Sequence, residues 1–312
     1  MEEAYTEFSR HYLQIPSSCD CAVVTLFAFT PLRARCPCLP SWAIDHTIFE
    51  DGYLDGIRTY AWALADYKHL QLRTSGSSHG LKFHENHLIL SGRFIDSINT
   101  IGQVNMYRAS TDDPDRSVIH TWRDVVLARK SAHEPYILPD GYNGKSYDWA
   151  TAWLRTLCAN RRLSGDENHV IQLTREEMAI IISDARRDPS NLLVLQHTPT
   201  LNRDLEAQML IPTARPDLHR QVYYVLFSVC YRSRIFLTQN DYLGIGNIDI
   251  QCGDRIFLSA RCGRPVILRP VDGSVSKWGR TTYMIVSSSY LDGFMDGPEE
   301  GVEFPCEEVW VE

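Results

Sequence analysis

The sequence predicts an α+β fold, in which a helical middle segment packs on a C-terminal antiparallel β meander or small barrel. Two observations predict it. The last quarter of the chain consists of apolar runs of four to six residues that end at Gly, Asn or Asp, as strands and hairpins do. The middle of the chain instead repeats apolar residues at helical spacing. Residues 1–230 are therefore expected to be mainly helical with a β hairpin at 81–98, and residues 231–312 mainly β.

The first elements follow from apolar spacing. Tyrosine, phenylalanine and leucine fall on one helical face over 4–14, and a second helix is predicted over 117–129. Between them, residues 81–98 read as a hairpin that turns near Glu85, with Leu88 and Leu90 on one face. A further helix is expected after Ser146.

Two local signals place the next helices. Thr174 and Glu177 have the spacing of a capping box, in which each side chain satisfies the other residue's backbone N–H. Pro216 suits the first turn of a helix that continues to Cys230, because proline lacks the N–H that this turn leaves unpaired.

Strands fill the remainder of the chain, with a loop expected at 271–280. No linker rich in Pro, Gly and Ser separates them from the helices, so 1–312 is expected to form a single compact unit. The predicted strands cover residues 234–238, 242–246, 252–258, 264–269 and 283–286.

The composition of the chain excludes some classes of binding partner and indicates a cellular compartment. The net charge is −8 and lysine and arginine form no block, which argues against nucleic acid and against an anionic membrane surface. No apolar stretch approaches the roughly 20 residues of a membrane span, and the opening Met-Glu-Glu does not resemble a secretory signal. Nine cysteines, an odd number, indicate free thiols in a reducing compartment, so a cytoplasmic protein is expected.

No metal and no cofactor are expected. Two Cys-x-Cys pairs, Cys19 with Cys21 and Cys36 with Cys38, could offer four thiolates to zinc, but structural zinc sites use Cys-x-x-Cys loops. Buried or idle thiols are the simpler interpretation. Gly244 and Gly246 lie between strands rather than between a strand and a helix, so tight turns explain them and no nucleotide is predicted.

Aromatic side chains are the candidates for binding a small apolar molecule. Rings form the walls of dry pockets, and a few polar tips orient the ligand. Taken alone, each ring more often belongs to the core than to a binding site. The side chains proposed to bind substrate are Trp42, Trp149, Trp153 and Tyr242.

The order of the C-terminal motifs resembles the C-terminal region of fungal heterokaryon-incompatibility (HET) proteins. The motifs run R-hydrophobic-T, Y-x-G-x-G, G-D-hydrophobic, P-hydrophobic-L-R and Y-x-x-G-x-M-x-G. Further elements of that family are matched by Leu39-Pro-Ser-Trp42 with Asp45, by residues 88–98 and by residues 153–157. The N-terminal HET effector signature does not occur, so the resemblance implies the C-terminal region without the effector domain.

The chain departs from this pattern beside Trp42. Where the family has L-P-S-W-V-P-D-W, this sequence places Ala43, Ile44, Asp45 and His46 after the tryptophan. An Asp–His pair can orient a proton donor near neutral pH, so His46 and Asp45 are the candidate catalytic residues; a surface pair without a role is the alternative.

Three charged residues match family positions, namely Arg155, Arg269 and Asp254. A buried arginine that reaches a carboxylate or a strand carbonyl would fix the strands to the helices. These residues are therefore expected to be structural.

Two functions remain open. The first is a cofactor-independent fungal biosynthetic enzyme that holds an apolar reactive intermediate in an aromatic pocket and steers a cyclisation or isomerisation, including a pericyclic one. Such reactions need a held conformer and one donor rather than a catalytic motif. The second is a non-catalytic HET-like recognition or regulatory module in incompatibility signalling, which the family resemblance implies. The sequence favours the enzyme slightly, since a domain without its effector needs another use.

Overall fold

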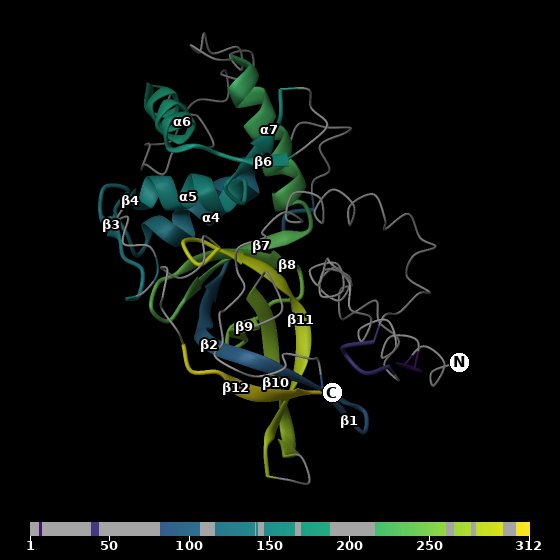
Figure 1. Cartoon of the computed structure of the whole chain (residues 1–312). Helices are drawn as coiled ribbons and strands as arrows, with labels where there is room; N and C mark the ends of the chain where they lie inside the picture. Colours follow the sequence, from purple (N-terminus) through teal and green to yellow (C-terminus); the bar gives the residue numbers. More distant parts are fainter. Residues whose placement is uncertain are drawn as a thin grey trace.

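A computed structural model of the 312-residue chain shows helices gathered over one end of a β barrel (Figure 1). This arrangement is the predicted α+β fold. The helices are α4 (Arg116–Leu127), α5 (Trp149–Leu157), α6 (Arg175–Arg187) and α7 (Pro216–Cys230). The structure describes residues 6–7, 39–43, 82–106, 116–140, 142, 147–165, 170–187, 216–259, 265–275, 279–295 and 304–312.

Local capping explains where two of these helices begin. The Oδ1 atom of Asp148 accepts from the backbone N–H of Thr151 at 2.9 Å and so caps α5. The predicted capping box opens α6, because Thr174 N donates to Glu177 Oε2 at 3.0 Å and Glu177 N donates to Thr174 Oγ1 at 3.2 Å. Helix α7 begins at Pro216, as predicted.

The large sheet closes into a barrel. Neighbouring strands run in the order β2-β7-β8-β11-β10-β9, and β9 pairs with β2 to complete the ring. Of the two predicted alternatives, the chain therefore forms the barrel. Its strands are β1 (Lys82–His84), β2 (His87–Ile101), β7 (Ser233–Thr238), β8 (Leu243–Asn247), β9 (Arg255–Ser259), β10 (Pro265–Val275), β11 (Thr281–Leu291) and β12 (Glu307–Val311).

Strand β2 holds the barrel together by changing partners along its length. Its first part pairs with β12, its middle with β9 and its last residues with β7, all antiparallel. Strand β12 also pairs parallel with β11, so it fills the space between β2 and β11. At Gly92, where β2 passes from β12 to β9, an added Cβ would lie 2.0 Å from the carbonyl oxygen of Leu258. Only glycine fits there.

Two hydrophobic clusters form the core. The larger joins helices α4 to α7 to the barrel, and the smaller contains Trp42 with parts of β2, β9, β10, β11 and β12. The strand alternation separates them, since Ile256 and Leu258 of β9 belong to the larger cluster and Phe257 to the smaller. Both faces of β9 are thus buried.

Some expectations need correction. The first half of the loop predicted at 271–280 is strand, because β10 runs to Val275. Strand β12 was not predicted. Nor were two short pairs, β3 (Pro135–Tyr136) with β4 (Tyr147–Asp148) and β5 (Arg161–Leu163) with β6 (Val170–Gln172).

Of the helix expected over 4–14, only residues 6 and 7 are described, and both are helical. The two Cys-x-Cys pairs lie outside the described residues. Among the helices that the structure describes, none combines the length and apolarity of a bilayer span.

Candidate functional site

A buried carboxylate joins α5 to the end of β11. Asp292 is completely buried and accepts three hydrogen bonds. Arg155 Nε donates at 2.7 Å, the Tyr147 hydroxyl at 2.7 Å and the Tyr290 hydroxyl at 2.8 Å. The Arg155 guanidinium also lies over the Tyr147 ring, 4.9 Å from its centroid. The helix and the barrel are therefore connected by a charge-assisted network.

The electrostatics of this network keep the Tyr147 phenol neutral. Burial raises the pKa of Asp292, and the Arg155 charge and the three hydrogen bonds oppose that rise. Burial, followed by the Asp292 charge, raises the pKa of Tyr147 strongly, so its hydroxyl remains a donor. The contacts from Arg155 and Tyr147 thus connect α5 and β4 to the end of β11, while Tyr290 donates from β11 itself.

A second ion pair fixes the barrel wall. Arg269 Nε donates to Asp254 Oδ1 at 2.7 Å and Nη2 to Asp254 Oδ2 at 2.9 Å, while Nη2 also reaches the Asp249 carbonyl at 2.7 Å. This is the bidentate geometry that makes arginine–carboxylate pairs strong. The structural roles predicted for Arg155, Arg269 and Asp254 are confirmed.

An aromatic cluster lies between the barrel and the loop that connects β3 with β4. Tyr142 packs 4.5 Å from Phe294 and stacks on Phe304 at 5.3 Å between ring centroids. Tyr242 meets Phe294 edge-on at 5.0 Å, and the Arg93 guanidinium lies over Phe304 at 4.4 Å. We call these five residues the donor cluster, because they bring one guanidinium and two phenols together among aromatic rings.

The polar groups of the donor cluster lack acceptors. The Tyr142 hydroxyl is buried, and within the described part of the chain it has no hydrogen-bond partner. Within the same part, Arg93 forms no ion pair. Asp96 is not its partner, since its two oxygens accept from the backbone N–H groups of Ser97 and Asn240, each at 2.8 Å.

Burial raises the pKa of both phenols, so their hydroxyls stay protonated and can donate hydrogen bonds. It raises the pKa of Tyr142 to about 12, against the opposing charge of Arg93. Burial also raises the pKa of Tyr242, and the Asp96 charge adds to that rise while Arg93 opposes it. Both hydroxyls are thus protonated near neutral pH. The guanidinium and the two phenols are hydrogen-bond donors that influence one another's charge state and have no protein acceptor among the described residues. They can therefore donate hydrogen bonds to an oxygen atom of a ligand.

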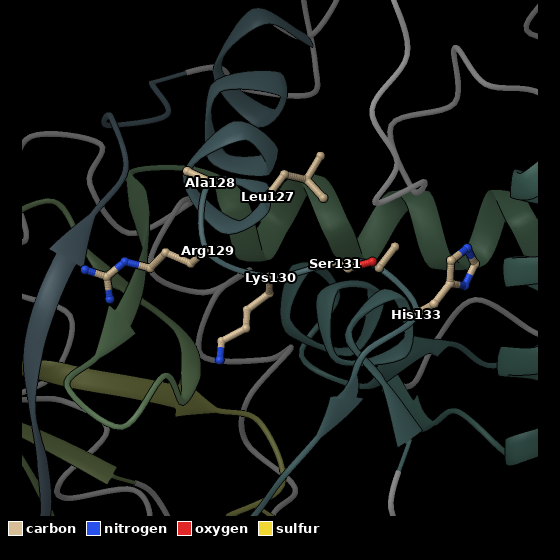
Figure 2. A pocket seen from close by; sticks show the side chains of 7 residues that line it. Leu127, Ala128, Arg129, Lys130, Ser131 and His133 are labelled. Carbon is tan, nitrogen blue, oxygen red and sulfur yellow. The ribbon is translucent and has the colours of Figure 1, made fainter.

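A surface hollow of about 600 Å³ follows the C-terminal end of α4 and is lined by residues 127–133. Figure 2 shows Arg129 and Lys130 projecting from one side of this loop and His133 lying at its far end. Arg129 Nη1 and Lys130 Nζ contact the two oxygens of Asp241 at 3.2 and 3.0 Å. Asp241 adopts φ 62°, a left-handed conformation that aspartate tolerates, in the turn between β7 and β8. These ion pairs therefore join the segment between α4 and β3 to the turn between β7 and β8.

The structure separates the predicted site residues. Trp42 is buried in the smaller core, where its Nε1 donates to the Asn86 carbonyl at 2.9 Å. Trp149 and Trp153 are buried in the larger core on α5. Among the predicted residues that the structure describes, Tyr242 belongs to the donor cluster. The predicted catalytic residues Asp45 and His46 lie outside the described residues.

Sequence reasoning missed the rest of the donor cluster. Arg93 is a charged residue in the middle of a half-buried strand, directly before Phe94 and Ile95, and that placement was a usable signal. Tyr142, Phe294 and Phe304 carry no comparable signal, because they come from connecting segments whose meeting depends on barrel closure.

Comparison with known proteins agrees with the barrel. Residues 201–302 match the Het-6 beta-barrel domain. That range contains β7, β8, β9, β10 and β11, whereas the closing strands β2 and β12 lie outside it. The chain is therefore related to HET proteins through its C-terminal region, as its motifs predicted.

One curated relative is the heterokaryon incompatibility protein 6, OR allele, of Neurospora crassa. It is 36% identical over 75 residues, which is 24% of this chain and 10% of that protein. The match thus spans about a tenth of the relative's length. No solved structure matches the chain.

Proposed function

We propose that this chain is a non-catalytic recognition module of the HET type that acts in fungal incompatibility signalling. The match of residues 201–302 to the Het-6 barrel carries the proposal. The relative's printed name supports it, because that protein is designated by heterokaryon incompatibility and by an allele. Incompatibility requires that matched and mismatched partners be told apart, and such discrimination is a difference between binding affinities.

The construction of the barrel supports a recognition role. The ring from β2 to β9 is closed, the ion pair of Arg269 with Asp254 fixes its wall, and that of Arg155 with Asp292 fixes it to α5. A rigid scaffold that positions connecting segments is a usual way to build a binding surface. The donor cluster lies on such segments, at Tyr142, Phe294 and Phe304.

A second function is favoured by the donor cluster itself. A neutral phenol in an apolar setting can polarise a carbonyl, so a cofactor-independent enzyme that steers a cyclisation or isomerisation of a small apolar molecule remains a candidate. In that case His46 or Asp45 would supply a further proton donor. His46→Ala would then lower the rate by roughly ten- to a thousand-fold.

A genetic experiment tests the recognition role. The full chain is expressed in paired strains of Neurospora crassa that differ at incompatibility loci, and heterokaryon growth is scored against strains with an empty promoter. The recognition role predicts impaired growth in some strain pairs and normal growth in others. It also predicts that His46→Ala retains this effect.

Two results would overturn the proposal. Normal heterokaryon growth in every strain pair, at verified expression, would exclude the incompatibility role in this host. Strain-independent toxicity that disappears with His46→Ala would instead support the enzyme.

A further inference from the structure

The donor cluster contains more hydrogen-bond donors than acceptors. The Arg93 guanidinium offers five N–H groups and the two phenols one O–H each, yet the Tyr142 hydroxyl has no partner within the described residues. Leaving a buried donor unpaired costs free energy comparable to a lost hydrogen bond. Native proteins keep such groups mainly where a ligand, ion or water completes them.

The fold assembles this cluster from five separate segments. Arg93 lies on β2, Tyr142 on the loop between β3 and β4, and Tyr242 directly before β8. Phe294 follows β11, and Phe304 precedes β12. Because Arg93, Tyr142 and Tyr242 come from parts of the chain far apart in the sequence, local structure alone does not bring the polar groups together. The closed barrel does, and it holds them without carboxylate neutralisation of Arg93.

Burial divides the cluster into a floor and a rim. Tyr142 and Phe294 are buried, at 2% and 0% exposed, and form the floor. Arg93, Tyr242 and Phe304 are each partly exposed and form the rim. A ligand that approaches from solvent would therefore first meet the exposed parts of Arg93, Tyr242 and Phe304, with the Tyr142 hydroxyl beneath them.

We infer that the donor cluster binds a carboxylate carried on an aromatic body. The carboxylate pairs with the Arg93 guanidinium and accepts from the Tyr142 hydroxyl, and the aromatic body packs against Tyr242 and Phe304. A ligand of this class is what the proposed recognition module would bind. Only the biological role of the binding rests on the proposed function.

Charge selects a monoanion. Arg93 is a single cation, and its planar fork matches a carboxylate in bidentate geometry. Asp96 acts on Tyr242 from nearby, and the whole chain carries a net charge of −8, so a dianion such as a phosphate monoester would meet more repulsion. The raised pKa of Tyr142 keeps its hydroxyl protonated and able to donate.

The same chemistry can come from two sources, a free aromatic acid or the terminal carboxylate of a peptide that ends in phenylalanine. Both are offered to the purified full chain by titration calorimetry and by ligand-observed NMR. The free-acid probe is 2-naphthoate, with 2-naphthamide as its neutral control. The peptide probe ends in Phe-COO⁻, and its control ends in the phenylalanine amide.

Two variants test the named contacts. Arg93→Gln is expected to weaken binding of the acid probe by about ten- to a hundred-fold, the range for a hydrogen bond to a charged group. Tyr142→Phe is expected to weaken it about five- to tenfold without lowering Tm, because the removed hydroxyl has no protein partner. Arg129→Gln in the surface hollow is the matched control and should leave binding unchanged.

The binding measurements give distinct results if the inference is right and if it is wrong. Binding of either acid with rejection of its amide, and its loss in Arg93→Gln, supports the inference, and the probe that binds identifies the source. Binding that is equal for acid and amide, equal in Arg93→Gln, or absent for both acids overturns it. Because these measurements use purified protein, they can fail while the heterokaryon assay succeeds, and the reverse holds as well.

Discussion

Replacing Arg155 by methionine tests the connection between helix α5 and the barrel. The change keeps most of the apolar stem and removes the guanidinium that donates to Asp292 at 2.7 Å. The side chains of Arg155 and Asp292 are 13% and 0% exposed, so solvent screens their interaction little. Removing one partner of a buried pair leaves an uncompensated charge and costs about 3–5 kcal/mol.

That loss can be read from urea unfolding followed by tryptophan fluorescence. For an m-value of about 3 kcal/mol/M, the midpoint should fall by about 1–1.7 M. The double variant Arg155→Met/Asp292→Asn should recover part of the loss, because neither charge then remains buried. The double-mutant cycle isolates the coupling between the two side chains.

The pH dependence of the variant has a defined sign. Burial already raises the pKa of Asp292, and Arg155 opposes that rise, so the variant raises it further. A carboxyl with a raised pKa in the folded state contributes stability that is complete below its unfolded pKa and is lost as pH rises through the folded pKa. The destabilisation by Arg155→Met should therefore shrink towards acid pH. A loss below about 1 kcal/mol, or strict additivity in the double variant, would refute the linking role.

Three further predictions follow from packing. Gly92→Ala should destabilise the chain by at least about 3 kcal/mol in thermal or urea unfolding, because the new Cβ meets the Leu258 carbonyl; Gly165→Ala, which meets nothing within 4 Å, is its control. Trp42→Ala should cost about 3–5 kcal/mol as a core truncation, so an unchanged Tm would contradict the burial of this ring. Limited proteolysis followed by mass spectrometry should yield no stable fragment of residues 230–312, since β2 completes the barrel from outside that range.

The fold was predictable where the information is local. The hairpin that turns at Glu85, the capping box at Thr174 and the proline that opens α7 each depend on residues within a few positions of one another. Strand β12 was missed because Glu307–Val311 is short and begins with two charges. Its partners, on β2 and β11, are set by barrel closure and not by its own pattern.

The site was predictable only in part, for the same reason. Aromatic residues were expected to line a binding site, and Tyr242 does belong to the donor cluster. Trp149 and Trp153 have the helical spacing of core residues, and both are buried in the core. Arg93 and Tyr142 meet only after the barrel has formed, so their juxtaposition is a property of the topology.

The change of partners along β2 also constrains how the protein can be made. Residues 87–101 leave the ribosome early, but Gly92 pairs with Glu307, which is synthesised much later. At about 5–20 residues per second, this strand waits roughly ten to forty seconds with unpaired backbone groups. Non-local strand pairing is slow in any case. Cotranslational folding can therefore proceed through the helices while the barrel stays open, and a chaperone that shields β2 during this interval should raise the yield of folded protein.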